Sequence, residues 1–227
     1  MLLHLAERLD IPLRERNILL NAAGFAPLFP ERPLDDPALH AARKAVDLVL
    51  AGHEPYPALA IDRHWNLITS NNAVPPLLAG VDPSLLQPPI NVLRLSLHPA
   101  GLASRIANLH EWRDHLFARL CRQIEVSGDP VLVALMAELA DYPAPDGIAS
   151  GKPETDAEFA SVAVPFQLIT EAGILSFIST TTVFGTPVDI TLSELALETF
   201  FPADAATAQA LRGLVPGVGE RDRDRDR

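Results

Sequence analysis

Cysteine is nearly absent from the sequence, and long hydrophobic runs are missing. Cys121 is the one cysteine among 227 residues, which excludes an internal disulfide and a thiolate metal cluster and fits a reducing compartment. We expect it to be a small buried side chain. Proline, arginine, histidine or aspartate interrupts every apolar segment before the roughly 18 residues that a membrane span needs. The N-terminus also lacks the basic and apolar stretches of a secretory signal, so the sequence predicts a cytoplasmic protein without a membrane partner.

Positive charge is scarce. The chain has 18 Lys and Arg residues against 29 Asp and Glu residues, its formal net charge is −11, and no basic block occurs. Binding to a nucleic-acid duplex depends on phosphate neutralisation by clustered Lys and Arg. The composition therefore argues against a nucleic-acid surface on this chain as it stands.

Motifs for catalysis and metal binding are also missing. No serine lies in a nucleophile-elbow pattern, and no glycine run could hold a phosphate. His110 and His115 lie on a predicted helix, but a spacing of five residues turns their side chains about 140° apart, too far to share one metal. We therefore predict no catalytic residue, no metal and no cofactor, although a site can still assemble from distant segments.

Hydrophobic residues make up 48% of the chain, enough to bury a core. Residues 2–10 and 12–24 have helical spacing, and the prolines of residues 25–35 predict an extended connector. A third helix begins at Asp36-Pro37, where a capping residue precedes a proline, and ends at Gly52. These patterns predict a helical first quarter.

The middle of the chain changes period twice. Residues 57–71 fit two short strands joined through Asp62-Arg63-His64. Residues 91–142 return to a helical pattern, with one helix opening at Asp129-Pro130. A segment rich in proline, glycine, alanine and aspartate follows at 142–156, and we interpret it as a linker.

The last third predicts a hairpin. Residues 161–170 and 174–184 are rich in β-branched and aromatic residues, and they flank Glu171-Ala172-Gly173, which suits a three-residue loop. That loop would pair Phe166 with Ile178 and Leu168 with Ser176, and would place Val164 opposite Thr180. A different loop length would reverse the faces.

Two helices are predicted after the hairpin. Thr191 and Glu194 form the pattern of a capping box for a helix over 192–201, and Asp204 is a candidate cap for a final helix. The terminal RDRDRDR alternates charges without an apolar face, which is typical of a solvated tail. Helices with a small antiparallel sheet indicate the α+β class.

One segment suggests a ligand site. Trp112 shares helical spacing with Leu109, Leu116 and Leu120, and an apolar groove beside a strand rich in serine and threonine suits a small amphiphilic ligand. Plain core packing explains the same residues. The pattern alone leaves both interpretations open.

Several segments carry a resemblance to a known family. They are LLHLAERLDIPLRERNILLNAAGFAPLFPERPLDDPAL, EPYPALAIDRHWNLITSNNAV, NVLRLSLHPAGLASRIANLHEWRDHL and FISTTTVFGTPVDITLSELALETFFPAD. Over residues 2 to about 212 the chain resembles the bacterial MmyB-like transcription regulators of the XRE helix-turn-helix class, which carry a DNA-binding domain followed by a PAS-like ligand-binding domain.

The resemblance implies a domain organisation. Residues 1–26 look like the last two helices of a truncated helix-turn-helix domain, and 27–53 like a connector and linker helix. Residues 54–212 look like an MmyB-like, PAS-like domain with an antiparallel sheet covered by helices, and 213–227 like a disordered charged tail. The recognition helix is missing, so DNA contact is expected only through absent N-terminal helices. The apolar faces of the first two helices are expected to fray or to find another surface.

The resemblance also implies a function and a site. We expect the sensing and dimerisation part of a transcriptional regulator, which binds a small hydrophobic, fatty-acid-like ligand and pairs as a homodimer or as a heterodimer with a full-length relative. Asn71 matches the position where PAS domains often place an asparagine that starts the next helix. The candidate ligand-binding residues are Leu67, Asn71, Leu93, Trp112, Leu116, Phe166, Leu168, Ile178 and Thr180.

An enzyme acting on a small apolar substrate is the alternative. It would use polar groups from Ser179, Thr180, Thr181 or Asn71, and it needs a base within hydrogen-bond reach. A histidine or carboxylate beside a pocket hydroxyl would favour the enzyme. A blind apolar cavity would favour the sensor.

Overall fold

The computed structural model describes residues 1–143, 164–185 and 187–214. Most of the predicted linker 142–156, the first three residues of the predicted strand 161–170, and nearly all of the predicted tail 213–227 lie outside the described residues. The α-helices are α1 (Leu2–Arg8), α2 (Leu13–Ala22), α3 (His40–Gly52), α4 (Val92–Leu97), α5 (Leu109–Ser127), α6 (Pro130–Ala140), α7 (Ile190–Ser193) and α8 (Ala205–Leu214). Short 3₁₀ helices cover Pro37–Leu39, Pro75–Leu78, Pro83–Leu86 and Ala103–Arg105. None of the described helices is long and apolar enough to cross a membrane.

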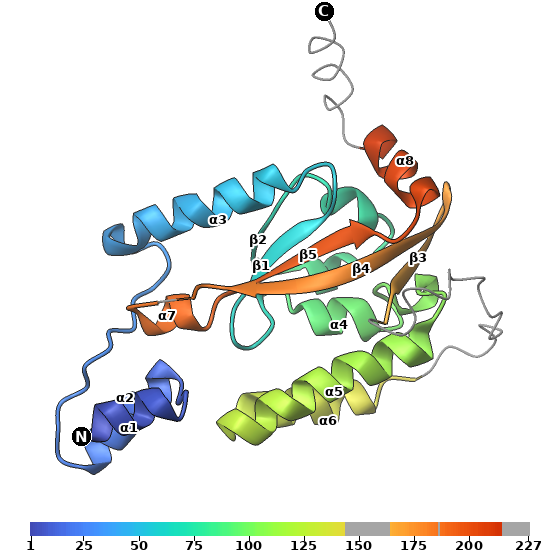
Figure 1. Cartoon of the computed structure of the whole chain (residues 1–227). Helices are drawn as coiled ribbons and strands as arrows, with labels where there is room; N and C mark the ends of the chain where they lie inside the picture. Colours follow the sequence, from blue (N-terminus) through green and yellow to red (C-terminus); the bar gives the residue numbers. More distant parts are fainter. Residues whose placement is uncertain (144–163, 186, 215–227) are drawn as a thin grey trace, which may run out of the picture.

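Five antiparallel strands form one curled sheet in the order β2-β1-β5-β4-β3. The strands are β1 (Ala58–Ile61), β2 (Leu67–Ser70), β3 (Phe166–Thr170), β4 (Gly173–Val183) and β5 (Ala196–Pro202). The two hairpins, β1–β2 and β3–β4, lie at opposite edges, and β5 joins them in the centre (Figure 1). This confirms the predicted α+β class with an antiparallel sheet covered by helices.

Strand β5 corrects the prediction of a helix over 192–201. Only Ile190–Ser193 is helical there, and its cap is Asp189, whose side chain accepts a hydrogen bond from the Thr191 N–H at 2.9 Å, rather than Thr191. The segment 196–202 pairs with β1 on one side and β4 on the other. Most of the side chains on both faces of this central strand are at least partly buried, so its apolar residues do not alternate with polar ones. Pairing on two edges overrides helix propensity.

The β3–β4 hairpin corrects the predicted register by one residue. Thr170 pairs with Gly173, so the loop is the two-residue Glu171–Ala172, and Phe166 pairs with Phe177. Gly173 has a φ of +109°, which a two-residue loop between twisted strands accommodates through glycine. Because side chains alternate along a strand, this shift moves Ile178 and Thr180 to the opposite face.

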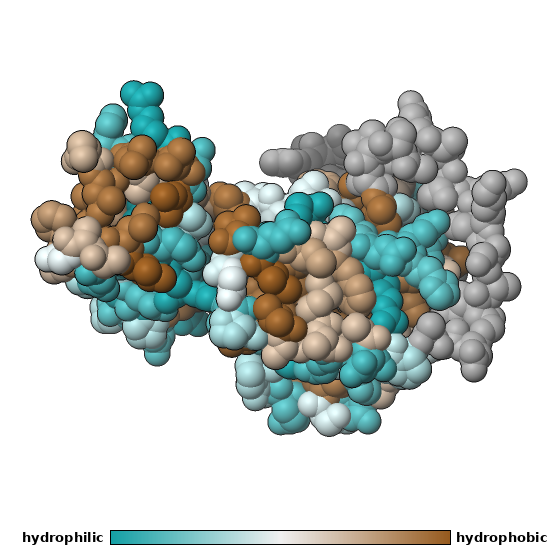
Figure 2. Space-filling view, turned by 90° about the horizontal axis from the view of Figure 1, so that it is seen from below, coloured by the Kyte–Doolittle hydropathy of each residue, from teal (hydrophilic) through white to brown (hydrophobic). Residues whose placement is uncertain are grey.

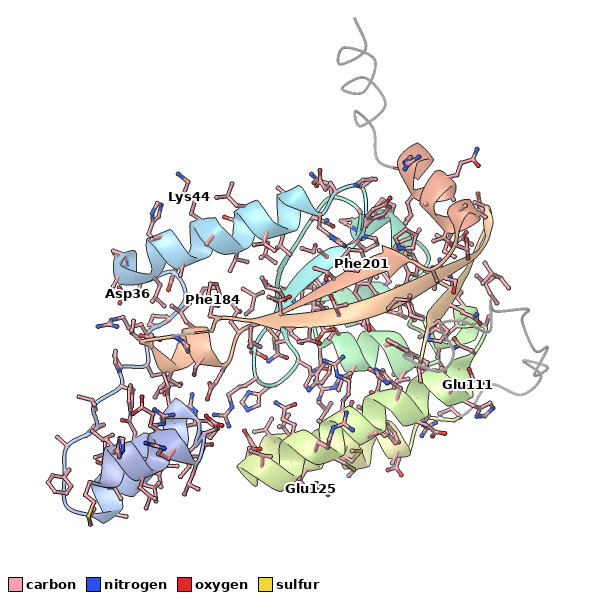
Figure 3. All side chains as sticks on the ribbon, in the orientation of Figure 1. Asp36, Lys44, Glu111, Glu125, Phe184 and Phe201 are labelled. Carbon is pink, nitrogen blue, oxygen red and sulfur yellow. The ribbon has the colours of Figure 1, made fainter. Side chains whose placement is uncertain are left out.

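Helices cover both faces of the sheet (Figure 1). On one face α3 packs Val46 and Leu50 against Ala58, Ala60 and Leu197, and Phe184 contacts the same cluster from the end of β4 (Figure 3). On the other face α4, α5 and α6 pack over a larger core. Capping agrees with the prediction at both helix starts, since the Asp36 carboxylate accepts from the Ala38 N–H and the Asp129 carboxylate from the Val131 N–H.

Cys121 is exposed, which corrects the expectation that it is buried. The side of α5 that faces the core carries Leu109, Trp112, Leu116 and Leu120. At about 100° per residue, position 121 turns away from that side.

Helices α1 and α2 form a separate lobe that is bound to α7 through the connector. The Ile190 N–H donates to Pro30 O at 2.9 Å, the Thr191 hydroxyl donates to Arg32 O at 2.6 Å, and Arg32 pairs with Asp189. The helix pair still exposes apolar side chains, as the space-filling view shows (Figure 2). These include Leu3, Leu5, Leu9, Ile18 and Phe25.

Candidate functional site

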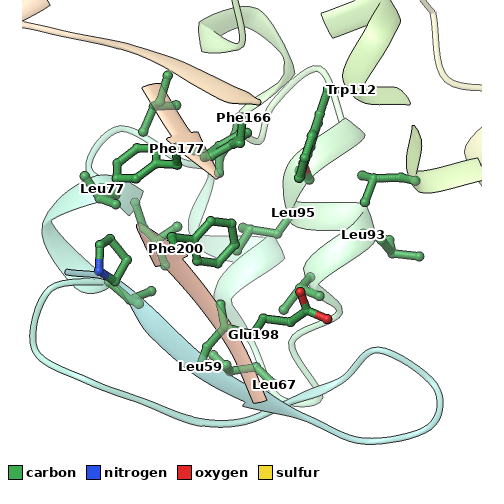
Figure 4. A pocket seen from close by; sticks show the side chains of 18 of the residues that line it. Leu59, Leu67, Leu77, Leu93, Leu95, Trp112, Phe166, Phe177, Glu198 and Phe200 are labelled. Atoms are coloured by element: carbon green, nitrogen blue, oxygen red, sulfur yellow. The ribbon is translucent and has the colours of Figure 1, made fainter. Parts of the chain in front are cut away.

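An apolar cavity of about 110 Å³ lies between the sheet and the helices that cover it. Figure 4 shows that its wall combines residues of the sheet with residues of α4 and α5. From the sheet come Leu59, Leu67, Phe166, Leu168, Phe177, Glu198 and Phe200, and from α4 and α5 come Val92, Leu93, Leu95, Ser96, Trp112, Leu116 and Arg119. Pro57, Trp65, Val74, Leu77, Leu78 and Leu102 complete it.

Four aromatic rings form one side of this cavity. The Phe166 ring centroid lies 5.0 Å from Trp112, 6.0 Å from Phe177 and 6.0 Å from Phe200. Trp112 is fixed further because its Nε1–H donates to Ser96 Oγ at 3.0 Å. Offset and tilted ring pairs at these distances are favourable beyond the area that they bury, so these contacts stabilise the wall.

One end of the cavity is charged. Arg119 Nη2 donates to Glu198 Oε1 at 2.6 Å and to Thr181 Oγ1 at 3.0 Å, and the Thr181 hydroxyl donates to the same Glu198 oxygen at 2.8 Å. The Arg119 guanidinium lies 4.7 Å from the centroid of the Trp65 ring. A buried carboxylate is tolerated when a cation and hydrogen bonds neutralise it, and Glu198 is nearly fully buried.

Six of the nine predicted ligand-binding residues lie on the cavity wall: Leu67, Leu93, Trp112, Leu116, Phe166 and Leu168. Ile178 and Thr180 do not, because the hairpin register turns them to the face of α3. There the Thr180 and Thr199 hydroxyl oxygens lie 2.7 Å apart. The structure therefore removes these two side chains from the cavity.

Asn71 is buried away from the cavity. Its Oδ1 accepts from the Ala58 N–H at 3.1 Å and the Ala73 N–H at 3.3 Å, and its Nδ2 donates to the carbonyls of Leu50 and Tyr56. These bonds use both ends of the side-chain amide. Asn71 thus ties the end of α3 to the start of β1 and to the segment after β2.

The sequence prediction missed Trp65, Phe177, Glu198 and Phe200, which all line the cavity. Glu198 and Phe200 lie in the segment predicted as a helix, and Phe177 was placed on the wrong face by the loop length. A pairing signal between residues 196–202 and both neighbouring strands would have been needed to find them, and a single sequence does not carry it.

Trp65 has an unusual backbone conformation, with a φ of +66°. Positive φ is strained for a bulky residue. The Trp65 N–H donates to Asp62 O at 3.1 Å, Trp65 O accepts from the Val92 N–H at 2.9 Å, and the indole Nε1–H donates to Gln123 Oε1 at 2.8 Å. These three bonds hold the ring against the cavity.

A second, polar cleft of about 420 Å³ lies between the α1–α2 lobe and the rest of the protein. Arg14 of α2 donates to both oxygens of Glu194, at 2.7 and 2.9 Å, and also pairs with Glu31. Arg63 contacts both Glu194 and Asp129. This cleft is a network of internally paired charges.

The electrostatics of Asp129 follow from that network. Burial alone would raise the pKa of its carboxyl, but hydrogen bonds from Arg63, from His64 and from the Val131 N–H outweigh it and lower the pKa from 3.8 to about 2. The Arg14 guanidinium likewise lowers the pKa of Glu31. Among the described residues, no group of three or more His, Cys, Asp or Glu side chains is arranged to hold a metal ion.

A comparison with protein families matches residues 42–214, more than half of the chain, to the family described as MmyB-like transcription regulator ligand binding domain. This range contains every residue of the cavity wall and begins within α3. No curated protein matches the chain.

Proposed function

Because the chain belongs to the family of MmyB-like transcription regulator ligand-binding domains, we propose that its effector is a small hydrophobic molecule of the fatty-acid type, bound in the cavity between the sheet and helices α4 and α5. Membership of the family implies a small-molecule effector. The chemical class of that effector and the residues that contact it are the proposal.

The single observation that carries this proposal is a cavity, partly open to solvent, with an almost entirely apolar wall. An engineered cavity of about 150 Å³ lined by Leu, Ile and Phe stays dry and binds benzene. A cavity of about 110 Å³ can therefore accept a short apolar group. A long acyl chain needs additional room, which requires movement of the wall.

The polar end of the ligand is proposed to lie near Arg119 and Ser96. Arg119 carries positive charge at the cavity, and a carboxylate or hydroxyl could share its guanidinium with Glu198. Leu67, Leu93, Trp112, Leu116, Phe166 and Leu168 are proposed to contact the apolar part. Asn71, Ile178 and Thr180 are not part of this proposed site.

We propose that binding acts by population shift. A ligand changes an equilibrium between two arrangements only through its different affinities for them. The regions 1–26, 27–53 and 54–212 are proposed to be the end of a helix-turn-helix domain, the connector and the sensing domain. DNA binding would belong to the helix-turn-helix part, and dimerisation would present two such parts together.

The enzyme alternative has one observation in its favour. Thr181 Oγ1 lies 2.8 Å from a carboxylate oxygen of Glu198, which is the hydroxyl and base arrangement that catalysis needs. However, the Glu198 oxygens already accept hydrogen bonds from Arg119 and from Thr181 itself. The Glu198 oxygen that Thr181 contacts is thus already held in an ion pair with Arg119, so the regulator remains the better supported function.

Extraction of the natively purified protein with organic solvent and mass spectrometry tests the proposal, followed by titration of the stripped protein with octanoic and tetradecanoic acid. We expect an apolar molecule in the extract and saturable binding with one ligand per chain. Leu77→Phe, which adds volume to the cavity wall, should weaken binding about tenfold or more. Thr180→Val, on the opposite face, is the control and should leave it unchanged. The fatty-acid assignment would be refuted if neither acid bound and the extract contained no apolar small molecule.

A further inference from the structure

The turn between β1 and β2 lies between the cavity and the polar cleft. Trp65 lines the cavity, and Arg63, two residues earlier, lines the cleft. Both are bound by the same side chain of α5, since Gln123 Oε1 accepts from the indole of Trp65 at 2.8 Å and Gln123 Nε2 donates to Arg63 O at 2.7 Å. A displacement of either residue must therefore disturb the other.

On the cleft side, Arg63 is the central cation of a chain of charges that ends on the α1–α2 lobe. Its guanidinium contacts the buried Asp129, which caps α6, and Nη1 lies 3.4 Å from Glu194 Oε1. Glu194 in turn binds Arg14 of α2 at 2.7 and 2.9 Å. The contact between Arg63 and Glu194 is the longest of these, and it connects the turn to the carboxylate that binds α2.

On the cavity side, the strained backbone makes Trp65 a residue that can move. A residue held at unfavourable φ persists only because its surroundings fix it. The ring is fixed by Gln123 and by the Arg119 guanidinium at 4.7 Å. A ligand larger than the cavity, or one that competes for Arg119, removes part of that support.

We propose that the Asp62–Trp65 turn couples occupancy of the cavity to the attachment of the α1–α2 lobe, with Trp65 responding to the ligand and Arg63 releasing Glu194. The inference rests on the proposed function, because it needs a ligand in the cavity. The coupling would carry the effect of ligand binding from the cavity to the α1–α2 lobe. When Arg63 withdraws, the Glu194 carboxylate loses one of the two cations that fix its position. The two-bond contact with Arg14, which holds α2 on α7 and the connector, then loses its fixed geometry.

Hydrogen–deuterium exchange on the full chain, read in peptides that cover residues 13–31, tests this coupling. In the wild type, saturating tetradecanoic acid should raise the exchange rate there about fivefold. Arg63→Gln should show raised exchange without ligand and no further response, while tryptophan fluorescence reports that binding is retained. Arg43→Gln, an exposed arginine on α3, is the matched control and should behave as the wild type. A normal ligand response in Arg63→Gln would overturn the proposal.

Glu194→Gln provides a second variant, because it weakens the contact with Arg63 while leaving Asp129 to cap α6. It also weakens the two contacts with Arg14, so raised exchange without ligand does not test the coupling, and only the ligand response is read. Tetradecanoic acid should raise exchange no further in this variant, and a wild-type ligand response would overturn the coupling.

A ligand-free arm separates failure of the coupling from failure of the fatty-acid assignment. Trp65→Leu should raise exchange of residues 13–31, and this effect should vanish in the Arg63→Gln background, because both act through one contact. Additive effects of the two substitutions would overturn the coupling whatever the ligand is. Failure of tetradecanoic acid to bind, with a non-additive result here, would refute only the ligand class.

Discussion

The two faces of the sheet use the same strands and bury different kinds of side chain. The face under α3 carries small residues, with Ala58 and Ala60 fully buried against Val46 and Leu50. The face under α4, α5 and α6 carries large rings and leucines, and it forms one wall of the cavity. Along β5, successive side chains point to opposite faces of the sheet. Leu197 packs under α3, whereas Glu198 and Phe200 line the cavity.

From this difference we expect the α3 face to be rigid and the cavity face to rearrange around a ligand. Small side chains let a helix approach closely, so the α3 face has little room to rearrange. On the other face, the large aromatic rings keep α4 and α5 farther from the sheet. Because gaps between such rings are hard to fill completely, a cavity remains there. The predictions below test whether the faces differ in this way.

Truncation of the cavity face should have the largest effect. Trp112→Ala removes a buried ring that contacts Phe166 and donates to Ser96, and it should lower the free energy of unfolding by about 3–5 kcal/mol. Urea unfolding of the ligand-free protein measures this. A loss below about 1 kcal/mol together with altered ligand binding would instead make Trp112 a wall residue that adds little to the fold.

Overfilling should separate the two faces. Ala60→Leu inserts three carbons under α3 at a fully buried position and should cost up to about 3 kcal/mol. Leu77→Phe adds volume beside the cavity and should cost less than about 1 kcal/mol, since space is present there. Parallel thermal and urea unfolding of the two variants gives the comparison. Equal costs would mean that the cavity face is packed as tightly as the α3 face.

Acid should loosen α6 before it loosens α3. The Asp129 carboxylate caps α6, and its pKa is lowered to about 2 in the folded protein. A lowered folded pKa means that this stabilisation, about 2 kcal/mol, is present above the unfolded pKa near 4 and is lost as pH falls towards 2. Asp129→Asn should flatten that part of the pH profile.

Exchange measured between pH 4 and 2, the range in which this stabilisation is lost, locates the acid effect. Peptides from α6 should lose protection before those from α3, whose buried contacts are apolar. Simultaneous loss in both helices would show that acid acts on the fold as a whole.

The smallest effect is expected at Thr180. Its hydroxyl lies 2.7 Å from that of Thr199 on the α3 side of the sheet, and one exposed or partly buried hydrogen bond contributes about 1 kcal/mol or less. Thr180→Val should therefore change the urea midpoint little and leave the cavity unchanged. Thr181→Val, at the next residue, removes hydrogen bonds with Arg119 and Glu198 and should lower the urea midpoint and alter ligand binding. Equal effects of the two variants on the urea midpoint and on ligand binding would contradict the assignment of Thr180 and Thr181 to opposite faces.

The sequence was sufficient where a signal is local. Asp36-Pro37 and Asp129-Pro130 gave the two helix starts, because a capping carboxylate and a proline act on their own neighbouring backbone. The spacing of Trp112, Leu116 and Leu120 gave the buried side of α5 for the same reason.

The sequence was insufficient where pairing decides the structure. Residues 196–202 become a strand only because two distant strands hydrogen-bond to them, and a one-residue difference in the hairpin loop exchanged Ile178 and Thr180 for Phe177 on the cavity face. Glu198 could not be predicted as a cavity residue until Arg119, 79 positions away, was known to neutralise it.

Because Cys121 is exposed, α5 can be labelled directly at its thiol. It is the chain's one cysteine, and it follows Leu120, whose side chain is fully buried on the inner side of the same helix. A dye or spin label attached to this thiol would lie on the solvent side of α5, the helix whose inner side lines the cavity. A signal from this label can thus report movement of α5 in the native sequence, without an introduced cysteine.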